Sequence, residues 1–304
     1  MNEFSNEIVQ RVQAELGDEV TIKLEDVIKT NDVKLTAMMI HQKDEDTGLN
    51  LYLDSYYESY KQGCPVGKIV ESLVERYQSS KNDIPKAEMI VHLKDFESVK
   101  EHITIRLLNK KMNEEYLKGK CFMEYLDFAV VFAITIDKKQ GASTIVLEEL
   151  RKIWDISKEE LYEIALANMQ SKEPCKIASI QNILFDLAEE HGADMKELID
   201  GLEVPNPPFY VMTNNSGIFG AVTILYKDAL KQFTKEHNVD NIMMIPASVH
   251  EWLLVFEDET LSKSYMQEMV KEVNDVEVRP DELLGYNIYR YDSKTDTVSI
   301  WSEE

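Results

Sequence analysis

The chain has 304 residues, with 33 Lys and Arg against 56 Asp and Glu, which gives a formal net charge of −23. This charge argues against direct binding of free nucleic acid, because the phosphates would be repelled. With 44% hydrophobic residues the chain can bury a substantial core, and its length suits two domains of about 150 residues or one larger body.

The N-terminus and the cysteines favour a cytoplasmic protein. Residues 1–5 lack the basic region and apolar core of a signal peptide, and no run approaches the roughly 18 apolar residues of a membrane helix. Cys64, Cys121 and Cys175 are odd in number and far apart, which suits neither a disulfide framework nor a zinc site. We therefore expect free thiols and no membrane contact, and the sequence predicts no oligomeric state.

The first third of the chain predicts a hairpin followed by a helix. Apolar residues at helical spacing predict a helix over residues 4–16, and Gly17 follows as a left-handed cap. Residues 35–41 and 49–54 flank a polar turn and predict two antiparallel strands. An apolar stripe over residues 66–77 predicts a core-facing helix.

A second hairpin and helix follow a segment, residues 84–120, that reads as mostly helical and charged. Residues 128–136 are almost wholly apolar and predict a central strand, with residues 142–147 as its return strand. Ser157 and Glu160 form the pattern of a capping box, which predicts that the next helix begins there.

The third unit repeats this order after a short helix at residues 180–187. Strands are predicted at residues 209–213, 218–226, 241–245 and 251–256, helices around residues 229–233 and 261–273, and a closing hairpin from residues 286–291 and 297–301. The expected class is α+β, with antiparallel β-hairpins each followed by amphipathic helices in a mixed sheet with helices packed on it.

The segment 204–208 is the best candidate for a domain boundary. Three of its five residues are prolines, which continue neither a helix nor a central strand. The predicted division is an N-terminal α+β region at 1–203, a Pro-rich connection at 204–208, and a C-terminal antiparallel sheet with two helices at 209–304. A stiff surface loop within one body is the alternative.

Polar residues interrupt the apolar strands between residues 246 and 251. Ser248, His250 and Glu251 combine a nucleophile, a base and a carboxylate within four positions. In an extended segment, however, Ser248 and His250 share one face while Glu251 points to the other, so no relay forms locally.

Two interpretations of this segment remain open. In one, distant acids such as Asp54 or Asp127 complete a catalytic site with His250. In the other, Ser248 or His250 satisfies backbone groups where Pro246 interrupts a strand ladder.

No cofactor or metal site is predicted. The other histidines are scattered singly, without the spacing of a zinc motif. Gly217 and Gly220 lie between two predicted strands, whereas a phosphate-binding loop opens a helix.

Aromatic residues offer candidates for protein contacts. Tyr56 and Tyr60 are spaced for one helix face, and Trp252 follows directly after the polar segment. Such residues are enriched at interfaces, and packing of the tyrosine face into the core is the alternative.

Four segments resemble an uncharacterised family of proteins of about 300 residues from gut anaerobes. The segments are residues 52–58, 124–129, 213–221 with Thr213, Asn214, Gly217, Gly220 and Ala221, and 245–251. The resemblance spans nearly the whole chain and implies one continuous unit. It carries no catalytic residue, cofactor or partner, and Trp252 departs from the usual pattern.

The sequence favours a non-enzymatic interaction or inhibitory factor that binds another protein with a basic surface. Its acids are interspersed along helix faces, which is typical of a solvated surface. The functional alternative is that the acidic surface imitates the phosphates of DNA and occupies a basic groove of another protein. The alternative function is a hydrolase or transferase of unrecognised type centred on residues 246–251.

Overall fold

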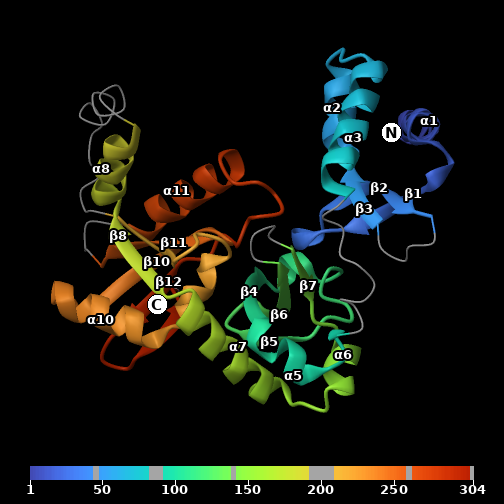
Figure 1. Cartoon of the computed structure of the whole chain (residues 1–304). Coiled ribbons are helices and arrows are strands. Elements are labelled where there is room, and N and C mark those ends of the chain that lie inside the picture. The colour runs from blue at the N-terminus through green and yellow to red at the C-terminus, as the bar shows by residue number, and fades with distance from the viewer. Residues whose placement is uncertain (44–47, 82–91, 138–141, 192–208, 258–261, 302–304) are drawn as a thin grey trace.

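The structure is a computed structural model that describes residues 1–43, 48–81, 92–137, 142–191, 209–257 and 262–301. It contains three open sheets with helices packed against them, which confirms the predicted α+β class (Figure 1). The prediction of a mixed sheet is corrected, since every strand pair in the described ranges is antiparallel. Most of these neighbours follow each other through short connections, which suit antiparallel pairing.

The N-terminal unit is a three-stranded sheet with helices on one face. Its elements are α1 (Asn2–Leu16), β1 (Val20–Ile28), β2 (Lys34–Gln42), β3 (Gly48–Tyr52), α2 (Asp54–Lys61) and α3 (Val66–Ser80). α1 packs on β1 and α3, and Gly17 ends α1 at a positive φ of 74°, as predicted. The strand β1 was not predicted, because its alternation includes Lys23, Glu25 and Asp26.

The middle unit is a four-stranded sheet in the order β4-β6-β5, with β7 also paired to β6. Its elements are α5 (Phe96–Val99), β4 (Ile103–Asn109), β5 (Phe122–Tyr125), β6 (Phe128–Asp137), β7 (Ala142–Ile145), α6 (Glu148–Ile153) and α7 (Lys158–Lys172). The Ser157 hydroxyl accepts the Glu160 amide at 3.1 Å, so the predicted cap of α7 is confirmed.

The helical prediction for residues 84–120 is wrong at β4. Ile103, Ile105 and Leu107 alternate toward the core and are nearly fully buried, which is the period of a strand. The charged residues on both sides of this short strand dominated the composition of the longer window.

The C-terminal unit is a six-stranded sheet in the order β13-β12-β10-β11-β9-β8. Its elements are β8 (Cys175–Ser179), α8 (Ile180–His191), β9 (Tyr210–Asn214), a 3₁₀ helix (Gly220–Leu225), α10 (Lys227–His237), β10 (Asn241–Ser248), β11 (Glu251–Phe256), α11 (Lys263–Val276), β12 (Tyr289–Asp292) and β13 (Thr297–Ile300). The predicted strand at residues 218–226 is wrong, because the buried 3₁₀ helix occupies most of it. A short continuous apolar run does not distinguish a strand from a buried helix.

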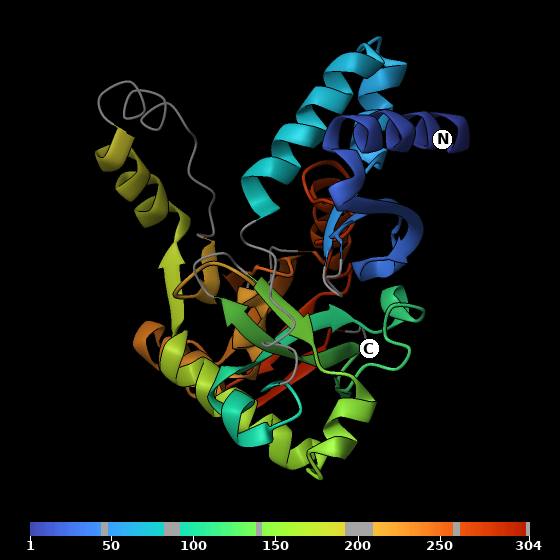
Figure 2. The ribbon, with the colours of Figure 1, turned by 45° about the vertical axis from the view of Figure 1, so that its right-hand side comes forward.

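One hydrophobic core joins the middle and C-terminal sheets. Trp252 is fully buried where these sheets meet, with its ring 5.8 Å from that of Phe128 and 5.3 Å from that of Tyr289. The N-terminal unit has a separate core, and both views show it to one side of the other two sheets (Figures 1 and 2).

The segment 204–208 lies outside the described residues, so the boundary placed there stays a prediction. β8 precedes this segment and pairs with β9 after it, so the C-terminal sheet draws strands from both sides. None of the helices in the described ranges has the length and apolar character needed to cross a bilayer.

Candidate functional site

The segment 246–251 covers the end of β10, the two-residue turn at 249–250 and the first residue of β11. Pairing of β10 with β12 ends at Met244, so Pro246 lies beyond that ladder. Pro246 pairs with Trp252 on β11, and the register shifts between Pro246 and Ser248. This bulge removes the simple alternation of faces that an extended segment would have.

The polar side chains of the segment are bonded to backbone amides. The Ser248 hydroxyl accepts the amide of His250 at 3.0 Å, and His250 Nδ1 accepts the amide of Phe219 at 3.0 Å. His250 Nε2 lies 3.7 Å from the Glu282 carboxylate, and Glu251 begins β11 opposite Ser248. Since the serine oxygen bonds to a backbone amide and not to the imidazole, the segment does not assemble a Ser-His pair.

The two distant acids, Asp54 and Asp127, accept hydrogen bonds from groups other than His250. Asp54 accepts the backbone amide of Thr36 at 2.9 Å in the N-terminal unit. Asp127 accepts the Tyr289 hydroxyl at 2.7 Å and the Asn287 amide at 2.9 Å. In the part of the chain that the structure describes, neither acid is bonded to His250.

Phe219 is the residue that the segment holds in place. Its φ of 51° is in the left-handed region, which is unusual for a bulky side chain and stores strain. The next residue, Gly220, is packed so tightly that an added Cβ would lie 2.1 Å from Thr213 Oγ1 and 2.4 Å from the His250 carbonyl oxygen. The Thr213 hydroxyl donates to that carbonyl at 2.8 Å, which ties β9 to the segment.

Phe219 in turn covers a guanidinium. Arg106 on β4 lies 4.2 Å from the centroid of the Phe219 ring and donates to the Ser143 hydroxyl. Burial lowers the pKa of Arg106 from its usual value, with the nearby Tyr116 phenol opposing that shift. Both Arg106 and Phe219 line a cavity of about 430 Å³ bounded by β4, β6, α7 and the loop after β9.

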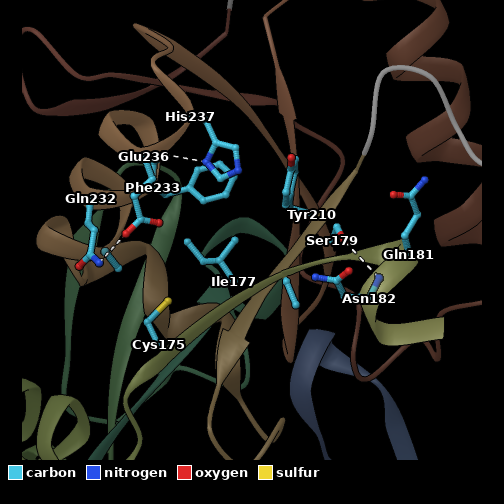
Figure 3. Close-up of a pocket in the computed structure, with 12 residues that line it drawn as sticks. Cys175, Ile177, Ser179, Gln181, Asn182, Tyr210, Gln232, Phe233, Glu236 and His237 are labelled. Carbon is cyan, nitrogen blue, oxygen red and sulfur yellow. Dashed lines mark hydrogen bonds between the residues drawn. The ribbon is translucent and has the colours of Figure 1, made fainter. Parts of the chain in front are cut away.

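A second cavity, of about 600 Å³, lies between β8, β9, α10 and the start of α8 (Figure 3). It contains Cys175 and His237, a pairing that suits nucleophilic catalysis in other settings. Burial raises the pKa of the Cys175 thiol to about 12, so the thiol is protonated at neutral pH. The His237 ring packs 4.3 Å from that of Phe233, and its Nδ1 lies 3.0 Å from the Phe233 carbonyl. This cavity is therefore not arranged to activate a nucleophile.

The aromatic candidates occupy different environments. Trp252 has no exposed surface and donates its indole N–H to the Ala221 carbonyl at 2.7 Å, so it offers nothing to a partner in this structure. Tyr56 is half-buried at the edge of the N-terminal core. Tyr60 is 43% exposed, with its ring 5.1 Å from that of Phe4.

The cavity around Arg106 was missed at the level of sequence. The available signal was a single arginine within the apolar strand Ile103–Asn109, since charged residues at such positions need a partner or a function. Within the described ranges, no three His, Cys, Asp or Glu side chains come together as a metal site would need.

The fold and this site define an open antiparallel α+β protein with a mainly apolar cavity around Arg106, lined by residues from strands of two of its sheets. A family model matches residues 1–293, and the chain belongs to that family, the family of unknown function DUF5688. No curated protein and no solved structure matches the chain.

Proposed function

We propose that this protein is a non-enzymatic interaction factor of the bacterial cytoplasm that binds a partner protein with a basic surface. The observation that carries this proposal is the outer face of α11. Val273 and Val276 lie one turn apart there and are 41% and 73% exposed, and Tyr286 beside them is 41% exposed. The Tyr286 hydroxyl donates to Asp275 at 2.7 Å, which fixes this ring at the surface.

Acidic side chains surround this apolar face, here called the α11 face. Glu268, Glu272 and Asp275 are exposed along the same helix and Glu277 directly after its end, in a protein of net charge −23. An apolar centre with a charged rim is the usual anatomy of a protein interface. A partner with basic residues around an apolar contact would match it, and the acidic rim would speed association at low salt.

The alternative, a hydrolase or transferase centred on residues 246–251, has no comparable observation in its favour. The Ser248 hydroxyl and His250 Nδ1 are both bonded to backbone amides. A general base needs a free nitrogen lone pair within reach of the proton that it removes, whereas in the neutral ring of His250 Nδ1 accepts the Phe219 amide and Nε2 carries the proton.

Affinity capture from native lysate of the source organism tests the proposal, with the wild type compared with Glu272→Lys and Val276→Ser. Glu75→Lys on α3 is the matched control, because it reverses an equally exposed acid on another unit. We expect one partner to be retained by the wild type and by the control at physiological salt, and to be reduced by both α11 variants. Failure to retain any partner at low or physiological salt, or equal retention by all variants, would contradict the proposal.

A further inference from the structure

The cavity around Arg106 presents a cation without an anionic partner. In the part of the chain that the structure describes, the Arg106 guanidinium forms no ion pair, and its one side-chain hydrogen bond goes to the Ser143 hydroxyl. A guanidinium has five N–H donors in a fixed fork. Most of these donors therefore have no acceptor on the protein.

This arrangement is unusual for so acidic a chain. Acids outnumber bases by 56 to 33, yet no carboxylate has been placed on this half-buried cation. A partly buried charge without a partner lowers stability, and such a cost is retained mostly where function requires it. The stacked Phe219 ring, held at a strained φ of 51°, screens one face of the cation from water.

The acids of the same cavity do not supply the missing charge. Glu173 is 8% exposed, and its carboxylate accepts the Ser216 amide at 3.0 Å. Glu101 is exposed, and the neighbouring Lys172 ammonium donates to its backbone carbonyl. Neither acid forms an ion pair with Arg106 within the described ranges.

We propose that this cavity binds a small organic monocarboxylate, with its carboxylate on the Arg106 guanidinium. The planar fork matches a carboxylate through two parallel hydrogen bonds. The volume of about 430 Å³ is within the range of small-molecule sites, which combine apolar walls with a few polar groups. Phe219, Ile136 and Ile218 provide apolar contacts for the body of the ligand.

The negative net charge of the protein favours a ligand with a single negative charge over a polyanion. The charged side chains that line the cavity, Glu101 and Glu173 against Arg106 and Lys172, sum to zero, so a phosphate dianion or a longer polyanion would add more negative charge to a protein of net charge −23 than a monocarboxylate on Arg106 would. A monocarboxylate satisfies that cation with the smallest additional repulsion. This site is separate from the α11 face, so the two proposals stand or fall independently.

Calorimetric titration of the full chain tests the site with acetate, benzoate and 3-phenylpropionate, each beside its neutral amide, and with phenyl phosphate. We expect 3-phenylpropionate to bind most tightly and its amide at least about tenfold more weakly. The neutral amide cannot form the charge-assisted hydrogen bonds that the carboxylate makes with Arg106 in a site shielded from water. Arg106→Gln should lower the affinity for the acid to that for the amide. Arg279→Gln, which removes an exposed arginine elsewhere, should leave it unchanged.

A second pair of variants keeps the test valid if Arg106→Gln does not fold. Ile218 lines the cavity and is 58% exposed, so substitutions there spare the core. Ile218→Glu should weaken binding of the acid several-fold more than Ile218→Gln, because only the former adds a negative charge. Equal binding of acids and amides, tighter binding of phenyl phosphate, no binding at millimolar concentration, or equal effects of the two Ile218 variants would overturn the proposal.

Discussion

The imidazole of His250 accepts a hydrogen bond from the backbone amide of Phe219, at 3.0 Å from Nδ1. In the neutral ring this bond leaves the proton on Nε2, which faces Glu282 at 3.7 Å. His250 therefore connects the β10–β11 turn to the loop that covers Arg106. Its evident role in this structure is to position Phe219.

Replacing His250 should test that role through stability. His250→Ala leaves the Phe219 amide without its acceptor, and we expect a loss of about 1–2 kcal/mol in the free energy of unfolding. His250→Asn should recover part of this loss, because the amide oxygen can accept the same bond. Urea denaturation measures both variants, with the exposed His92→Ala as the control. Equal losses for Ala and Asn would contradict the assignment.

Gly220 should tolerate no side chain. A Cβ there would meet Thr213 Oγ1 at 2.1 Å, the His250 carbonyl at 2.4 Å and the Asn214 amide nitrogen at 2.8 Å. We expect Gly220→Ala to destabilise the fold by about 1–3 kcal/mol, the usual cost of overpacking. Gly67→Ala in α3 is the matched change, because nothing lies within 4 Å of its added Cβ. That variant should be stabilised by about 0.5–1 kcal/mol, since alanine favours helix.

Trp252 should behave as a core residue. Its side chain is fully buried against Phe128 and Tyr289, so Trp252→Ala should cost about 3–5 kcal/mol in thermal or urea unfolding. Tyr60→Phe, at a partly exposed position, should change stability by less than about 0.5 kcal/mol. A near-neutral effect of Trp252→Ala would show that the tryptophan is not packed as described.

Two cysteine thiols, Cys121 in the core and the half-buried Cys175, should make stability fall at alkaline pH. Burial raises the pKa of Cys121 to about 12, with Glu148 adding to the shift, and burial also raises that of Cys175 to about 12. An unfolded thiol titrates near about 8.5, so above that pH the unfolded state releases protons that the folded state retains. The stabilising contribution of these two thiols to the free energy of unfolding is complete below about pH 8.5 and is lost as the pH rises toward 12.

Urea denaturation at a series of alkaline pH values measures this effect. The unfolding free energy of the wild type should fall from pH 9 upward, and Cys175→Ala should show a shallower slope because one titrating thiol is gone. Parallel slopes for the two proteins would mean that Cys175 is not protected from ionisation.

The sequence predicted elements with strong local signals and missed those defined by distant contacts. The cap at Ser157 and the helix end at Gly17 depend on neighbouring residues, and both predictions are confirmed. β8 is five residues long and pairs with residues of β9 that lie 31 to 39 positions later, so no local pattern marks it.

The candidate site shows the same limit. The polar segment 246–251 was visible as a pattern, but the partners of Ser248 and His250 were not. The bulge after Pro246 redirects these side chains, and the acceptor role of His250 depends on Phe219, which lies 31 positions earlier. The cavity around Arg106 depends on the contact between β4 and the loop that carries Phe219, which the sequence does not reveal.

The central claim is that His250 is a structural acceptor and not a catalytic base. It is tested most directly by NMR of ¹⁵N-labelled protein near neutral pH, through the tautomer of His250 and the coupling across its hydrogen bond. The structure predicts a neutral ring with the proton on Nε2, and a measurable nitrogen–nitrogen coupling between His250 Nδ1 and the Phe219 amide. A proton on Nδ1 with no such coupling would contradict the claim and return His250 to the candidates for catalysis.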